Sequence, residues 1–251
     1  MPTIYANTND GYAYNTGDTT HAACRDAASA DAVSTSGTSH NIYLYYKQPG
    51  RGRSSHYSVR RIFYYFDTSG ITSTVSSATF NLFKASLTPT ADAILVKSDA
   101  FGGDGGTALS TGDFDAFPGF TAGSTDSMQG AVTDYSSEFT MASVWTSINS
   151  YSSGGVTLSS DALSDMVSND YLIFALVNSD YDYKNIDPAG STVGSLYPFY
   201  ATDFSGTDRD PKIDYTLATG YTHDVSGLAA ASISKVNTVA TANIGKINSV
   251  D

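Results

Sequence analysis

The sequence contains little charge and almost no glutamate. Charged residues make up 15% of the 251 positions, and Glu138 is the single Glu among 25 acidic residues, so the other 24 are Asp. Asp favours turns and helix caps whereas Glu favours helix interiors, so this imbalance argues against a helical protein. The net charge of -12 also disfavours a nucleic-acid partner, because phosphate binding needs a basic surface.

Cysteine and long apolar runs are scarce as well. Cys24 is the only cysteine, so no disulfide can form within the chain. No apolar run approaches the roughly 20 residues that a membrane-spanning helix needs. Residues 1–5 lack the basic and apolar regions of a signal peptide. We therefore expect a protein made in a cytoplasm and not exported by the usual route.

Catalytic and metal-binding motifs are the third absence. The sequence has no Gly-x-Ser-x-Gly, His-Glu-x-x-His or Cys-x-x-Cys motif, and its four histidines have no ligand spacing. We expect no enzymatic activity and no cofactor. A structural calcium ion is the alternative: Asp180 and Asp182, with Asn185 or Asp187, are the best candidates, although Lys184 stands where an oxygen ligand belongs.

Turn-forming and aromatic residues are abundant instead, with 22 Gly, 18 Tyr and 12 Phe. Such a composition is typical of an all-β protein. In the segment 74–84, Ala78, Phe80 and Leu82 fall on one face and Thr79 and Asn81 on the other, the period of two of a half-buried strand. Residues 1–220 therefore predict one β-sandwich domain.

Further elements follow from local pattern. Strands are expected at residues 41–46, 59–66, 74–84, 93–97, 138–148, 171–177, 196–200 and 212–217, with 15–40 as a long surface loop. The apolar segment 171–177 should lie in the core, and Pro198 predicts an edge strand because proline cannot donate to a ladder. Phe114 and Phe117 should anchor a long connection. One short helix is expected, with Ser160 as its N-cap.

Basic residues gather in one short segment. Five of the 13 lie between positions 47 and 61, namely Lys47, Arg51, Arg53, Arg60 and Arg61. One interpretation is a solvated hairpin tip. The other is a docking patch for an acidic neighbour, because arginine forms two parallel hydrogen bonds with a carboxylate.

The C-terminal arm, residues 221–251, differs from the rest of the chain. The segment 233–239 recurs after 11 residues as 244–250, which suits either a slightly right-handed helix or an extended arm. Its apolar stripe is too narrow to fold alone. Because free termini are normally disordered, we expect a neighbouring subunit to hold the arm. The anchoring residues predicted are Val225, Leu228, Ile233, Val236, Val239, Ile244, Ile247 and Val250.

Two parts of the sequence resemble known families. Residues 61–71 together with 77–82, and later 200–215, are similar to the DNRLRE-type β-sandwich family. The repeats of the arm resemble terminal repeats in virion proteins of tailed phages. The first resemblance spans roughly residues 4–218 and implies a jelly-roll-like antiparallel β-sandwich used for surface display or adhesion, without an enzymatic site. The lack of a signal peptide is what a phage virion protein would show.

Two functional hypotheses follow. The first is a structural protein of a phage virion, in particular a capsid decoration (cement) protein bound through its arm to the major capsid protein or to copies of itself. The second is a glycan-binding adhesin or tail-fibre module that holds a host-surface glycan on exposed tyrosines. A hydrolase would need Asp in at least one of two paired carboxylates, because the chain has a single Glu.

Overall fold

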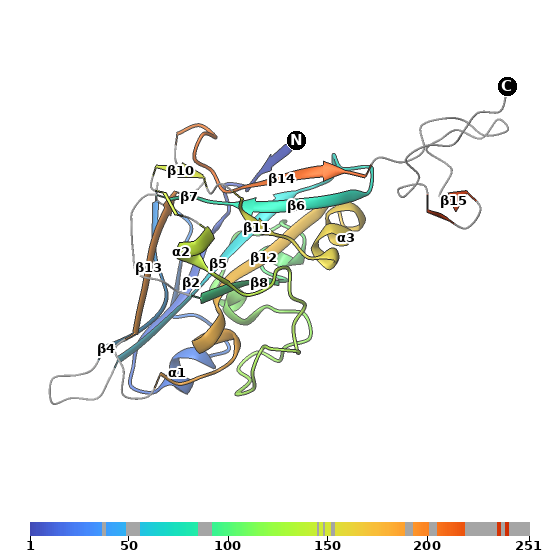
Figure 1. The fold of residues 1–251 in the computed structure, drawn as a ribbon. Helices are drawn as coiled ribbons and strands as arrows, with labels where there is room; N and C mark the ends of the chain where they lie inside the picture. The colour runs from blue at the N-terminus through green and yellow to red at the C-terminus, as the bar shows by residue number, and fades with distance from the viewer. Residues whose placement is uncertain are drawn as a thin grey trace, which may run out of the picture.

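Two antiparallel sheets of unequal size form the framework of the described chain, as the computed structural model shows (Figure 1). The structure describes residues 1–36, 39–48, 56–84, 92–144, 146–147, 149–151, 154–188, 193–200, 205–218, 235–236 and 239–240. The predicted all-β class and the packing of antiparallel sheets are confirmed. None of the helices among these residues has the length and hydropathy needed to cross a membrane.

The strands divide into a large and a small sheet. The large one contains ten described strands: β2 (Gly11–Asp18), β3 (Ala32–Ser34), β4 (Ser39–Gln48), β5 (His56–Asp67), β7 (Phe83–Lys84), β8 (Asp92–Lys97), β9 (Phe139–Thr140), β10 (Ser150–Tyr151), β12 (Tyr171–Asn178) and β13 (Val193–Tyr200). The small one has the order β1 (Thr3–Tyr5), β14 (Lys212–Leu217), β6 (Val75–Asn81) and β11 (Val156–Thr157). Both sheets are thus built from residues 3–217.

The strand β5 organises the large sheet. Its β-branched and aromatic residues suit a pleated surface, and it extends the predicted strand 59–66 at both ends. Along one edge β5 pairs with β2. Along the other it pairs with β4 near its start and with β12 near its end. The next strand in the chain, β6, joins the small sheet and packs across the core from β5.

Alternate side chains of β5 enter two separate hydrophobic cores. Ile62, Tyr64 and Phe66 face the small sheet, whereas Val59 and Phe63 face a layer of loops and short helices on the opposite side. The large sheet is therefore covered on both faces in its central part. Continuous apolar runs, as in β8 and β12, are expected of strands buried on both sides.

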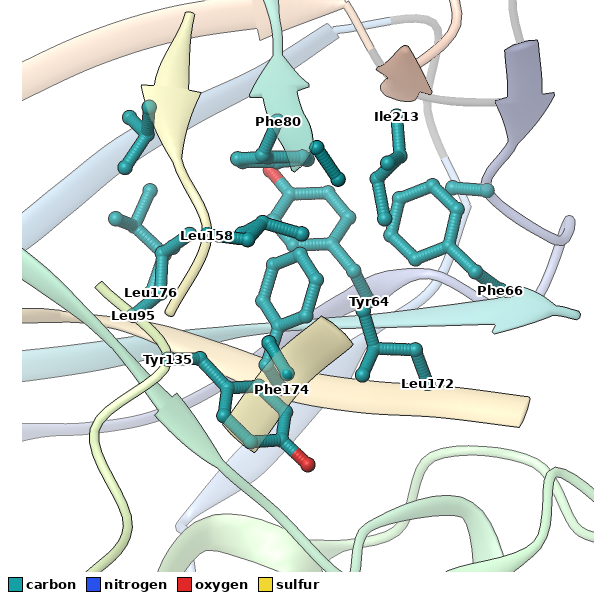
Figure 2. Packing of buried hydrophobic residues seen from close by; sticks show 14 of the residues in the cluster. Tyr64, Phe66, Phe80, Leu95, Tyr135, Leu158, Leu172, Phe174, Leu176 and Ile213 are labelled. Atoms are coloured by element: carbon teal, nitrogen blue, oxygen red, sulfur yellow. The ribbon is translucent and has the colours of Figure 1, made fainter. Parts of the chain in front are cut away.

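The first core lies between the two sheets and is centred on aromatic rings (Figure 2). The ring of Phe174 lies 5.0 Å from that of Phe80 and 5.7 Å from that of Tyr64, measured between centroids. Ile213 from β14 packs into the same cluster. The helix α3 (Ser160–Ser168) closes one side with Ala162 and Met166, and its N-cap is Ser159, one residue before the predicted cap.

The second core lies on the other face of the large sheet. It is covered by α1 (His21–Arg25), by the 3₁₀ helices η1 (Phe101–Gly103) and η2 (Thr111–Asp115), and by the π-helical turn η3 (Ser179–Tyr183). Phe114 and Phe117 are buried here, which confirms that they anchor the long connection after β8.

Three sequence predictions on elements are wrong. The expected loop 15–40 contains the end of β2, then α1, β3 and the start of β4. Its residues are small and polar, but Asn15 is buried and donates from Nδ2 to the Cys24 carbonyl at 3.1 Å. The expected strand 138–148 is reduced to β9, and α2 (Met141–Val144) follows because Met141 turns into the first core.

The third error concerns β13. This strand lies between β4 and β7 in the sheet order, so it is not an edge strand over its whole length. Its pairing with β7 is confined to Phe199 and Lys84, and Pro198 pairs on the β4 side with Asn41. Proline is accommodated because most of the other edge of β13 has no ladder partner among the described strands.

Within the C-terminal arm the structure describes one short element. β15 (Lys235–Val236) and β16 (Val239–Ala240) pair antiparallel as a separate two-stranded sheet, with Val236 opposite Val239. The other six predicted anchoring residues lie outside the described residues, namely Val225, Leu228, Ile233, Ile244, Ile247 and Val250.

Candidate docking site

Arg61 sits at the centre of a buried ionic cluster. Its side chain is fully buried and forms two parallel hydrogen bonds with Asp182, of 2.9 Å from Nε and 2.7 Å from Nη2. Nη1 donates to Asp115 at 2.6 Å and to the Phe114 carbonyl at 2.7 Å. Burial alone disfavours the charge, but the attraction of Asp182 and Asp115 outweighs it and raises the pKa of Arg61.

Arg25 extends the same cluster from α1. It is also fully buried, and its Nε donates to the Asp182 carbonyl at 3.0 Å. Its Nη1 donates to the carbonyls of Ser124 and Asp126 and to the Asp26 carboxylate. The two arginines therefore tie α1, η2, η3 and the loop around residue 124 to one another. Arg61 also anchors this layer to β5 of the large sheet.

The basic segment is not one surface patch. Arg61 cannot belong to the predicted docking patch, because its guanidinium is buried and paired inside the chain. Lys47 is 5% exposed and donates to the Pro188 carbonyl. Arg51 and Arg53 lie outside the described residues. Neither the hairpin-tip nor the docking interpretation therefore holds for the whole segment, since alternate strand positions face opposite sides of the sheet.

Arg60 remains half-buried and lies with two tyrosines. Its guanidinium carbon is 4.8 Å from the ring centroid of Tyr12 and 5.1 Å from that of Tyr14, which is its register partner on β2. The two rings are 5.7 Å apart. Both tyrosines are half-buried, and sequence alone could not select this Tyr12–Tyr14–Arg60 cluster among 18 tyrosines.

The carboxylates predicted as calcium ligands in the loop after β12 are instead paired with basic side chains of the chain itself. Asp182 faces Arg61 and Arg25, and Asp180 accepts a hydrogen bond from Lys184 at 3.1 Å. Positive side chains at these carboxylates oppose the binding of a divalent cation. Among the residues that the structure describes, no group of three His, Cys, Asp or Glu side chains could hold a metal ion.

A surface groove of about 400 Å³ lies between α3 and the start of β6. Its apolar lining comes from Leu163 and Val167, one helical turn apart on α3, and from Val75 on β6. Three serines, Ser160, Ser164 and Ser168, follow one another along α3 with helical spacing and form a polar rim. Met166 of α3 is buried in the first core, whereas Leu163 and Val167 are half-buried and pack against it from outside.

The body of the chain, by which we mean residues 1–218, ends beside this groove. Leu217, the last residue of β14, pairs with Val75, and the amide of Ala218 donates to the Thr74 carbonyl at 2.7 Å. Leu217 is 39% exposed, so the last residue of β14 presents an apolar side chain to solvent. The segment that leads into the C-terminal arm therefore starts at the rim of an apolar groove.

Asp210, in the turn before β14, makes a pH-dependent contribution to stability. The residue is 6% exposed, and burial raises its pKa from 3.8 to about 6. The folded state therefore holds this proton more tightly than the unfolded state, and the resulting stability is lost as pH rises through 6. We expect Asp210→Asn to raise the free energy of unfolding at pH 7.5 by about 1–3 kcal/mol, because one pKa unit is worth about 1.4 kcal/mol.

Urea unfolding at pH 7.5 and at pH 4 measures this difference. The gain should shrink toward zero at pH 4, where Asp210 is protonated in the folded chain. Asp208→Asn, at an exposed position two residues earlier, is the matched control and should change stability little at either pH. A gain of equal size at both pH values would contradict the assignment.

The structure separates the residues predicted to bind a partner. Arg61 is inside, Arg60 is half-buried, and Val236 and Val239 oppose each other in the arm. Sequence reasoning missed the groove, since the apolar positions of α3 were visible but their distance from Val75 was not. No protein-family model matches the chain, and comparison with curated proteins gives no match.

Proposed function

We propose that this chain is a non-enzymatic structural protein of a phage virion, in particular a capsid decoration protein. Its C-terminal arm, residues 221–251, attaches it to neighbouring subunits, either the major capsid protein or further copies of itself. The observation that carries the proposal is that the described strands of the large and the small sheet all lie within residues 3–217, whereas the two described strands of the arm, β15 and β16, pair with each other.

Two sequence features support this function. The arm resembles terminal repeats of phage virion proteins, and the segments 61–82 and 200–215 resemble a family of jelly-roll-like domains used for surface display. A jelly-roll-like topology is accordingly part of the proposal. Two packed antiparallel sheets are compatible with such a fold. Localisation to the virion after synthesis in the host cytoplasm follows from the same proposal.

Deletion of residues 222–251 tests the function. We expect the truncated chain to stay folded, because every described strand of the large and the small sheet is retained, but to disappear from assembled particles. Incorporation is measured by the amount of the protein that co-sediments with purified particles. Circular dichroism of the truncated chain controls for folding. Incorporation at the level of the full chain would contradict the proposal.

A glycan-binding adhesin or tail-fibre module is the second candidate. The Tyr12–Tyr14–Arg60 cluster favours it, because aromatic faces with a neighbouring polar group are suited to stack on sugar rings. A titration of the full chain with host-surface polysaccharide distinguishes the two candidates. Saturable binding that Tyr14→Ala abolishes would favour the adhesin, and no binding at millimolar sugar would remove it.

A further inference from the structure

We propose that the groove between β6 and α3 binds a C-terminal repeat, residues 233–239 or 244–250, from a second copy of this chain. The inference rests on the proposed function and names the site to which the arm attaches. It thereby assigns the contact between decoration subunits to a defined surface, lined by Val75, Leu163 and Val167.

The chemistry of the groove matches that of the repeats. Each repeat carries three aliphatic side chains with a spacing of three, Ile233, Val236 and Val239 in the first repeat. Polar residues separate them along the chain. The groove has a volume of about 400 Å³ and an apolar floor, so it can hold a few aliphatic side chains. The serines along its rim can hydrogen-bond with the polar residues between them.

The origin of the arm favours exchange between two copies. β14 reaches the edge of the body at Leu217, where its arrowhead ends beside the start of β6 (Figure 1). Residues 219–232 separate this edge from the first repeat and can span roughly 50 Å when extended. The first repeat can therefore reach the same groove on a second copy without close contact of the two bodies, and the exchange is reciprocal if a two-fold axis relates the copies.

Charge also favours this pairing. Residues 219–251 contain Asp224, Asp251, Lys235 and Lys246, so they are neutral overall and the whole net charge of -12 resides on residues 1–218. Each repeat brings one lysine to this acidic body. On α3 itself, Asp161 is exposed in the first turn. Contact of one whole body with another is disfavoured by like charge, whereas contact of an arm with a body is not.

Disulfide trapping between full-length chains tests the site. One copy carries Ser164→Cys at the groove rim and the other carries Asn237→Cys in the first repeat. The native Cys24 does not interfere, because it is buried and burial raises the pKa of its thiol. Under mild oxidation we expect the mixed pair to cross-link about ten-fold faster than a control pair, because docking raises the local concentration of the two thiols.

The control pair replaces Ser164→Cys with Thr121→Cys, an exposed position on the loop layer at the other face of the large sheet. A further variant that carries both Ser164→Cys and Leu163→Asp should cross-link with the Asn237→Cys chain at the control rate. Equal rates for Ser164→Cys and Thr121→Cys would overturn the proposal. So would a doubly substituted chain that cross-links only within itself, since the occupant would then be its own arm.

These outcomes are separable from a failure of the proposed function. If deletion of residues 222–251 prevents incorporation into particles but the cross-linking rates are equal, the arm attaches the protein at another surface and only the groove is wrong. If the truncated chain is incorporated like the full chain, the arm is not the attachment and the proposed function fails.

Discussion

Replacing Arg61 with methionine is expected to lower the free energy of unfolding by about 3–5 kcal/mol. The substitution keeps an unbranched side chain of comparable length but leaves the Asp115 carboxylate without its cation. Asp182 loses both hydrogen bonds from Arg61 and keeps only Arg25, whose Nε lies 3.5 Å from Oδ1. Both carboxyl groups are almost completely buried, with side-chain exposures of 0% and 1%. An uncompensated buried charge costs far more than the loss of an exposed ion pair. Urea unfolding followed by circular dichroism measures the difference.

Arg60→Met is the matched control at the adjacent position of the same strand. Arg60 is half-buried and lies over Tyr12 and Tyr14, so its loss should cost no more than about 1 kcal/mol. A double variant with Arg61→Met and Asp115→Asn should recover part of the stability, because it removes the buried charge that lost its cation. Equal small effects at positions 60 and 61 would contradict the buried cluster.

Phe174→Ala is the second substitution with a large expected effect, a loss of about 3–5 kcal/mol in the free energy of unfolding. The ring lies at the centre of the first core, where Phe66, Phe80, Tyr64 and Tyr135 surround it (Figure 2). Truncation removes these aromatic contacts and leaves a cavity between the two sheets. The surrounding rings come from β5, from β6 and from the loop at Tyr135, so they cannot close the space without moving these segments.

The midpoints of thermal and urea unfolding of Phe174→Ala should therefore fall strongly, with the slope of the urea transition unchanged. Tyr5→Ala provides the control, since Tyr5 is an aromatic residue of β1 that is 41% exposed. Its loss should change stability by no more than about 0.5 kcal/mol. A similar loss for both variants would show that the core between the sheets is not the main source of stability.

The two cores have different roles in the proposed assembly. The first joins the small sheet and α3 to the large sheet, and so it positions the groove that we propose as the docking site. The second core and the ionic cluster hold the loop layer on the opposite face. Arg61→Met should thus destabilise the loop layer first, whereas the groove depends on the packing around Phe174.

The sequence by itself determined the strands of the central layers. The apolar segments 93–97 and 171–177 and the aromatic segment 59–66 became β8, β12 and β5, because local composition reports directly on burial. The roles of Phe114 and Phe117 as anchors were visible for the same reason. Residues 15–40 were mistaken for a surface loop, since hydrogen bonds such as that from buried Asn15 to the Cys24 carbonyl hold the segment in place and no local pattern reveals them.

Only the tertiary structure decided which charges lie inside. Arg60 and Arg61 are neighbours with the same chemistry, but opposite faces of β5 give them opposite environments. Asp115 and Asp182, the partners of Arg61, are 54 and 121 residues away in the chain. Likewise, Val75 meets Leu163 and Val167 only where β6 and α3 pack together. The physical reason is common to both cases: a side chain's type is local, whereas what it faces depends on contacts between distant segments.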